Sequence, residues 1–197
     1  MARPDRRPAG HVPGGYEMWL VIGGELLAFS LFFILFAWYR GDQPELFARS
    51  QQLLDRDMGL ANTIVLLTSS LLVAIAVRRE RLDRPSYRPL MVTTAGCGVI
   101  FGILKVFEYR EKFMHGVTPL TNDFFMLYFA FTGIHMIHVT IGSVLLLVMA
   151  RLSAHRLASG ARTTMIECGA TFWHLVDLLW IMLFGLLYLA GGTASHG

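Results

Sequence analysis

Charged residues and cysteines are both scarce in this chain, and each scarcity limits the classes of protein to which it can belong. Charged residues make up 16% of the 197 positions, whereas soluble globular domains carry about a quarter. Hydrophobic residues make up 54%. The two cysteines, Cys97 and Cys168, lie in apolar segments and fit neither a CxxC pair nor a zinc pattern. The composition predicts an integral membrane protein, with both cysteines acting as small buried hydrophobic residues.

Motifs for several other functions are also missing. No serine occupies a Gly-x-Ser-x-Gly turn, which argues against an intramembrane hydrolase. No basic stripe is interleaved with aromatic residues, so nucleic acid is not an expected partner. Residues 1–15 hold no short apolar core before a cleavage site, so no removable signal peptide is expected. We expect a polar tail at 1–15, one transmembrane domain at 16–190 and a short tail at 191–197.

Five apolar segments are long enough to cross a bilayer, which takes about 20 helical residues. They cover about 16–39, 60–77, 90–109, 124–149 and 168–190. Between the first two, the stretch FARSQQLLDRD is expected to form a short helix at the membrane interface. The sequence therefore predicts an all-α membrane bundle of five transmembrane helices.

Lysine and arginine are distributed unequally between the two sides of this bundle. The N-terminal tail and the second and fourth loops carry eleven of them, and the opposite side carries five. Because positive residues accumulate in cytoplasmic loops, the N-terminus is predicted to be cytoplasmic and the C-terminus outside.

The last span carries polar residues that lipid tails cannot satisfy. Its Trp173, Asp177, Trp180 and Phe184 recur at the spacing of one helix face. We expect this face to be a docking and lipid-facing surface. The side chain of Asp177 is expected to pair with His174 or with an arginine near the cytoplasmic end.

Ionisable residues inside the other spans also need partners. Lys105 and Glu108 lie near a span end, where snorkelling or a local i,i+3 pair explains them. Glu25 is expected to be a protonated or paired carboxyl group set against small residues. His135 and His138 lack a third metal ligand nearby, so both imidazoles are expected to form hydrogen bonds within the bundle core.

Several functions stay open on the residues alone. A di-haem cytochrome needs four axial histidines on facing helices, and three histidines lie well inside the spans. Glu25 and Asp177 are residue types used in proton relays, but no ladder of carboxylates or inverted repeat accompanies them. A protein that binds lipids and another membrane subunit is favoured. The alternatives are an independent proton-linked transporter and a stand-alone membrane haem protein.

The segment WHLVDLLWIMLF at 173–184 resembles the last helix of the haem-copper oxidase subunit III family, cytochrome c oxidase subunit III. Four further segments resemble the preceding helices in the right order. They are MWLVIGGELLAFSLFF, NTIVLLTSS, KVFEY and GIHMIHVTIG. The chain is similar to the five-helix bacterial form. HVPGGYEMW and PELFARSQQLLDRDMGLANT are similar to its nitric-oxide-reductase-associated, NorE-type branch.

This resemblance implies a non-catalytic accessory subunit of a respiratory complex in a bacterial inner membrane. Haem and copper would belong to subunit I, with subunit II as a further partner, and this chain would hold no metal and no catalytic residue. Bound phospholipid and support of proton uptake by subunit I are also implied, and Glu25 matches the family's buried functional carboxyl group. The residues implied at lipid or subunit interfaces are Glu108, His135, His138, Trp173, His174, Asp177 and Trp180. The partner's acceptor, oxygen or nitric oxide, is left open.

Overall fold

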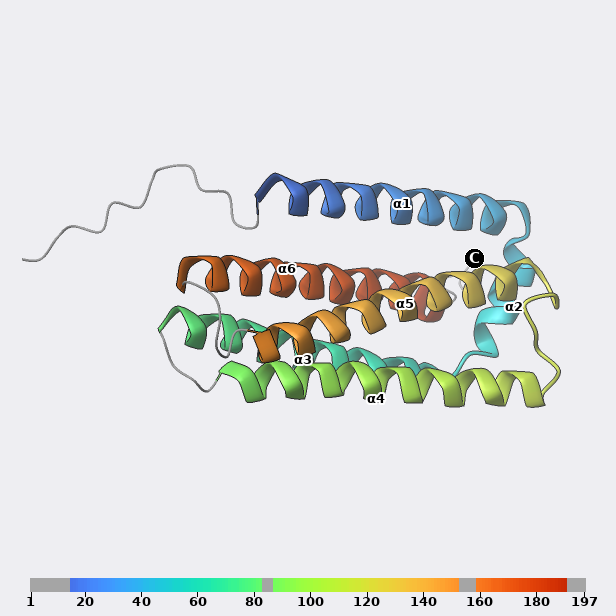
Figure 1. The fold of residues 1–197 in the computed structure, drawn as a ribbon. Coiled ribbons are helices and arrows are strands. Elements are labelled where there is room, and N and C mark those ends of the chain that lie inside the picture. The colour runs from blue at the N-terminus through green and yellow to red at the C-terminus, as the bar shows by residue number, and fades with distance from the viewer. Residues whose placement is uncertain (1–14, 83–86, 153–158, 191–197) are drawn as a thin grey trace, which may run out of the picture.

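The computed structural model describes residues 15–82, 87–152 and 159–190, which form a bundle of helices without strands (Figure 1). Within these described residues, five helices each contain a stretch long and apolar enough to cross a membrane. They are α1 (Gly15–Asp42), α3 (Arg56–Arg81), α4 (Tyr87–Met114), α5 (Asp123–Leu152) and α6 (Ser159–Phe184). The predicted all-α bundle of five spans is confirmed, and the chain is a multi-pass membrane protein. The tails predicted at 1–15 and 191–197 lie, apart from Gly15, outside the described residues.

The helices extend beyond the predicted spans at most ends. α6 begins at Ser159, well before the predicted start at 168, and a π-helical turn, η1 (Gly185–Leu189), follows it. Backbone hydrogen bonding continues past the apolar window, because that window marks only the part of a helix that suits the hydrocarbon. The short helix expected after the first span is α2 (Pro44–Gln52), and its Phe47 is buried against the bundle.

Local capping explains where these helices start. Pro44 stands at the first position of α2, where a missing N–H costs nothing. Asp55 caps α3 by accepting hydrogen bonds from the backbone N–H groups of Asp57 and Met58 at 2.9 and 3.1 Å. Asn122 does the same for α5, since its side-chain oxygen accepts from the N–H of Phe125 at 2.9 Å.

Four helices, α3 to α6, form the core, and α1 packs against α5 and α6 from outside (Figure 1). Of the five spans, α6 is the most buried and α1 the least. The outer side of α1 exposes large apolar side chains, including Leu20, Leu31 and Trp38. The last span is therefore the central element of the bundle, and the polar residues that it carries face other helices of the same chain.

Side-chain bonds to backbone carbonyls hold the end of the bundle near α2. The guanidinium group of Arg40 donates to the Ala190 carbonyl at 2.7 Å, and the Gln51 amide donates to the Leu186 carbonyl at 3.0 Å. The ammonium group of Lys112 donates to a carbonyl of the α2–α3 connection at 2.6 Å. These bonds fix α1 and α2 over the ends of α4 and α6.

Candidate functional site

Trp173 of α6 is the side chain at which the four core helices meet. It is fully buried, and its indole N–H donates to the Ser69 hydroxyl of α3 at 2.9 Å. Its ring lies against Gly98 of α4 and Gly142 of α5, where an added Cβ would lie 3.0 and 2.9 Å from ring atoms. These two glycines make the space that lets one tryptophan contact three neighbouring helices.

Trp180 repeats this arrangement two turns further along α6. Its indole N–H donates to the Thr63 hydroxyl of α3 at 3.0 Å, and its ring lies 4.8 Å from the Phe101 ring of α4. The His135 ring of α5 lies 5.2 Å from the Trp180 ring. Neither ring nitrogen of His135 has a hydrogen-bond partner in the described part of the chain, so the prediction that this imidazole bonds within the core is wrong.

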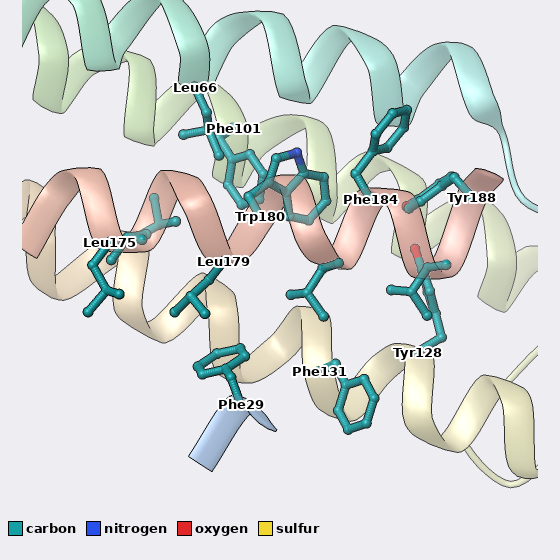
Figure 2. Packing of buried hydrophobic residues seen from close by; sticks show 14 of the residues in the cluster. Phe29, Leu66, Phe101, Tyr128, Phe131, Leu175, Leu179, Trp180, Phe184 and Tyr188 are labelled. Atoms are coloured by element: carbon teal, nitrogen blue, oxygen red, sulfur yellow. The ribbon is translucent and has the colours of Figure 1, made fainter. Parts of the chain in front are cut away.

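The two sides of α6 face different neighbours. Figure 2 shows Trp180 and Phe184 directed from α6 toward α3, and Leu175 and Leu179 directed to the other side, toward Phe29 of α1. All of these side chains belong to one buried cluster. Both sides of α6 are thus occupied by the protein itself.

Asp177 lies between the two tryptophans and is 3% exposed. Neither carboxylate oxygen has a hydrogen-bond partner among the described residues. Ser70 of α3 lies near this carboxylate, but its hydroxyl makes its 2.7 Å hydrogen bond with Nδ1 of His174. The predicted pairing of Asp177 with His174 or with an arginine is therefore wrong, because His174 bonds to the Ser70 hydroxyl instead and no described arginine bonds to either carboxylate oxygen of Asp177.

Five of the residues predicted at lipid or subunit interfaces are buried inside the bundle. They are Glu108, His135, Trp173, Asp177 and Trp180. The residues spaced along α6 do share one helix face, but this face packs on α3, α4 and α5 of the same chain. This corrects the prediction of a docking surface there. His138 and His174 do reach the surface in part.

A buried charge cluster joins α4, α5 and η1. Lys105 Nζ lies 2.9 Å from Glu108 Oε2, and the two side chains are 0% and 1% exposed. Glu108 Oε1 accepts from the hydroxyls of Tyr128 at 2.7 Å and Tyr188 at 2.6 Å, and Lys105 donates to the Tyr188 hydroxyl at 2.7 Å. The predicted i,i+3 pair is confirmed. Snorkelling is wrong, since neither side chain reaches the surface.

Sequence reasoning missed the two tyrosines of this cluster, although the spacing of α4 contained a signal for its location. The buried positions of α4 recur every three or four residues. They include Tyr87, Met91, Thr94, Gly98, Phe101, Lys105, Glu108 and Lys112. Because both charges follow the same stripe as Phe101, this pattern places them toward the core rather than toward lipid.

Glu25 of α1 and His138 of α5 form a polar contact between α1 and the core. Glu25 Oε2 lies 3.0 Å from His138 Nε2, and the side chains are 25% and 15% exposed. Phe29, one turn along α1, packs edge-on against the His138 ring at 5.8 Å. The predicted pairing of Glu25 is present. A Cβ at Gly23 or Gly24 would meet nothing within 4 Å, so these two glycines do not pack closely against a neighbouring helix. The expectation that small residues surround Glu25 stays a prediction.

The hydrogen bonds of His138 determine where its protons lie. Its Nδ1 is 2.8 Å from the Ile134 carbonyl oxygen, which can only accept, so Nδ1 carries a hydrogen. Without a further proton, Nε2 and the Glu25 carboxylate would both be acceptors. Either a neutral carboxyl group donates to Nε2, or an imidazolium donates to a carboxylate. In both forms the pair has no net charge and holds one shared proton.

No three His, Cys, Asp or Glu side chains lie close enough to hold a metal ion in the described part of the chain. The two histidines of α5 contact different neighbours, since His135 lies against Trp180 and His138 against Glu25. Cys97 and Cys168 are only partly buried, which corrects the prediction that both are core residues. The expectation that this chain carries no metal or cofactor stays a prediction.

Residues 15–192 match the family described as cytochrome c oxidase subunit III. The chain belongs to the cytochrome c oxidase subunit III family. One relative is the cytochrome bo(3) ubiquinol oxidase subunit 3 of Buchnera aphidicola subsp. Acyrthosiphon pisum, 27% identical over 180 residues, which cover 89% of this chain and 86% of the relative. Cytochrome c oxidase subunit 3 of Alkalihalophilus pseudofirmus is 26% identical over 185 residues, covering 88% and 84%. That of Synechocystis sp. is 34% identical over 134 residues, covering 65% and 54%.

The family match confirms the resemblance that WHLVDLLWIMLF and the four earlier segments indicate. In this subunit III chain those segments supply Trp173, which contacts three neighbouring helices, and also the Lys105–Glu108 and Glu25–His138 pairs. The motifs thus correspond largely to groups that join helices to one another. The assignment to the nitric-oxide-reductase-associated branch stays a prediction.

Proposed function

We propose that this chain is a non-catalytic accessory subunit of a haem-copper respiratory complex in a bacterial inner membrane. It would pack beside subunit I, which holds the haem and copper, with subunit II as a further partner. The observation that carries this proposal is the family match over residues 15–192, since it spans all five transmembrane helices rather than a single motif. The relatives are themselves named as third subunits of ubiquinol and cytochrome c oxidases.

The geometry supports a scaffolding role. The indoles of Trp173 and Trp180 and the Lys105–Glu108 cluster are directed inward, where they join α3, α4, α5 and η1. These polar groups are used to hold the bundle in one arrangement. A rigid bundle with an apolar exterior is suited to packing against a larger membrane subunit and keeping it in a working conformation.

Within this proposal, the Glu25–His138 pair is the group that acts toward the partner. In this pair a carboxyl group of α1 meets an imidazole of α5, and both side chains are partly exposed at the surface. A shared proton inside an uncharged pair can move between oxygen and nitrogen without creating a net charge in the membrane. Support of sustained proton uptake by the partner is the role we assign to it.

The proposal predicts how the partner complex behaves without this chain. Membranes from a deletion strain should show a near-normal initial rate with the physiological acceptor but lose activity sooner during continuous turnover. Expression of the native chain should restore the working lifetime. Measuring both oxygen and nitric oxide consumption identifies the acceptor. Equal lifetimes with and without the chain, for both acceptors, would refute the accessory role.

A further inference from the structure

Asp177 is buried at the middle of the last span, and its carboxyl group needs a ligand. The span runs from Thr164 to Leu189, and Asp177 is 3% exposed. Neither of its oxygens has a hydrogen-bond partner in the described part of the chain. Buried polar groups in folded proteins are nearly always bonded to protein or to ordered water, and a bare carboxylate inside a membrane is costly. The described side chains do not supply the ligand that this group requires.

Protonation of Asp177 would satisfy only one of its two oxygens. A neutral carboxyl group can donate its proton to a carbonyl oxygen one turn back in α6, as the Thr171 hydroxyl does to the Glu167 carbonyl at 2.8 Å. The second oxygen can only accept a hydrogen bond, and no described donor reaches it. Arg78, the nearest arginine along α3, stands about 12 Å further along that helix than Ser70. A small molecule that donates hydrogen bonds would complete the shell.

The neighbours of Asp177 are short and polar. Ser70 of α3 and Cys97 of α4 both lie close enough to interact electrostatically with its carboxyl group. The Ser70 oxygen already bonds to His174 Nδ1 at 2.7 Å, and its second lone pair can accept another hydrogen bond. A buried water molecule makes about two to four hydrogen bonds. The carboxyl oxygens, the hydroxyl and the thiol together offer that many, whereas a hard divalent cation would need about six oxygen ligands.

A groove connects this position with the membrane surface. It has a volume of about 430 Å³ and lies between the last turns of α3 and the first half of α6. Arg81 and Glu167 stand at its mouth and pair at 2.8 Å. His174 lines the groove and bonds to Ser70, the side chain next to Asp177. The Ser70–His174 bond therefore lies between the groove and the buried carboxyl group, and water entering at the charged mouth can reach it there.

The buried imidazole of His135 has no such surroundings, although its ring nitrogens also lack described partners. The rings of Phe101 and Trp180 lie 5.5 and 5.2 Å from it. Aromatic faces offer a water molecule no strong hydrogen-bond partner, and neither of these residues lines the groove. The combination of short polar neighbours with a route to the surface is a property of Asp177.

We propose that the core of this bundle binds water at Asp177, beside Ser70 of α3 and Cys97 of α4, and that the water enters through the groove past His174. The water donates to the carboxyl oxygens and so allows α6 to carry this group at the middle of the membrane. The proposal does not depend on the accessory function, because it concerns the interior of the chain itself.

Hydroxyl-radical footprinting of the full chain in mild detergent tests the site directly. An X-ray pulse splits bound water, the radicals oxidise the side chains beside it, and mass spectrometry measures the oxidised fraction of each residue. Cys97 is the reporter for the site. Met136 is the internal control, since it is another half-buried sulfur side chain midway along a span. In the native chain Cys97 should be oxidised and Met136 should stay near background.

Three variants separate bound water from other causes of oxidation at Cys97. Asp177→Leu and Ser70→Val each remove a ligand of the water, so most of the Cys97 oxidation should be lost. Asp177→Asn keeps hydrogen-bonding groups at the site and should retain it. Cys168, which is also half-buried, should be oxidised equally in all four proteins. Helical circular dichroism during heating identifies any variant that fails to fold, and Ser70→Val then tests the site without changing Asp177.

Two results would overturn the proposal. The first is oxidation of Cys97 in the native chain at no more than the background of Met136, which would mean that the carboxyl group is dry. The second is Cys97 oxidation that stays unchanged in both Asp177→Leu and Ser70→Val, or that is lost in Asp177→Asn as well. In either case Cys97 would report its own packing rather than water bound at Asp177.

Discussion

Lys105 brings a positive charge into the interior of a membrane bundle, and its neighbours determine whether the fold can hold it. Glu108 supplies the opposite charge, and the Tyr128 and Tyr188 hydroxyls complete the shell around the carboxylate. The Lys105 ammonium also lies 5.0 Å from the centre of the Trp180 ring, close enough for a cation–π contact. A buried ion pair can be replaced as a unit more easily than it can be broken.

Breaking this pair should therefore destabilise the bundle more than removing it. Lys105→Met and Glu108→Gln should each lower the free energy of unfolding by about 3 to 5 kcal/mol, because each leaves an unpaired buried partner. The double variant should lose much less than the sum of the two. Unfolding in mixed micelles, followed by loss of helical circular dichroism, measures all three.

The exposed pair of Glu45 and Arg49 provides the control for this series. Glu45→Gln should change the unfolding free energy by less than about 1 kcal/mol, as is typical of surface ion pairs. If either Lys105→Met or Glu108→Gln unfolds like the native chain, the cluster does not stabilise the fold.

Glu25 is a different case, because its partner can be kept while its proton is removed. In Glu25→Gln, the amide N–H can still donate to His138 Nε2, so the contact and the fold should be retained. The shared proton is lost, and the partner complex should start at a normal rate but inactivate sooner during turnover. Ser30→Ala, at an exposed position of the same helix, is the control. An unchanged working lifetime would limit Glu25 to a packing role.

The spacing of residues along the sequence predicts only some of the ion pairs and hydrogen bonds. The i,i+3 spacing of Lys105 and Glu108 identified that pair, because both residues lie on one helix. The bond from Glu25 to His138 joins residues more than 100 positions apart, and that from His174 to Ser70 likewise. Such partners depend on how the helices pack, and this explains why spacing along α6 does not predict the environment of Asp177.

At the scale of helices, the fit between Trp173 and two glycines determines how closely α6 packs against α4 and α5. The Trp173 ring occupies the space left by Gly98 and Gly142, so α4 and α5 approach α6 closely at this level. Hydropathy predicts all five spans but does not distinguish the central one, because each is apolar enough to face lipid. The burial of α6 follows from side-chain shape, which the periodic pattern does not report.

Filling one of these spaces should loosen the bundle. In Gly142→Ala the new methyl group would lie 2.9 Å from a Trp173 ring carbon, and the ring has other helices around it. Overpacking of this kind costs about 1 to 3 kcal/mol, so the thermal midpoint in detergent should fall. Gly133→Ala on the same helix meets nothing within 4 Å and should leave the midpoint nearly unchanged. Equal midpoints for both variants would show that α5 can move away from Trp173 without cost.

Helix ends were the least predictable part of the elements. Hydropathy placed the start of the last span at 168, whereas α6 begins at Ser159. The π-helical turn that follows α6, and brings Tyr188 onto Glu108, has no signature in the apolar pattern. In the structure, Pro44 and Asp55 stand where α2 and α3 begin, and the hydropathy windows do not register such capping residues.

On the scale of the whole molecule, polar interactions are concentrated inside and apolar surface outside. α1 is the span with least burial and joins the core through Phe29, the Glu25–His138 pair and Arg40 at its end. A five-helix bundle of this kind offers a broad apolar exterior to lipid and to a larger membrane subunit. The family match and this distribution together support assembly rather than independent chemistry.

Co-purification from native membranes tests that central claim most directly. The chain, tagged at one end and expressed at its natural level, is isolated in mild detergent, and the eluate is examined by haem absorbance and by mass spectrometry of the subunits. We predict one haem-bearing, multi-helix subunit for each copy of this chain, with the haem absorbance following that subunit when the two are separated. Recovery of the chain without a haem-bearing partner, or haem absorbance that stays with the separated chain, would contradict the account.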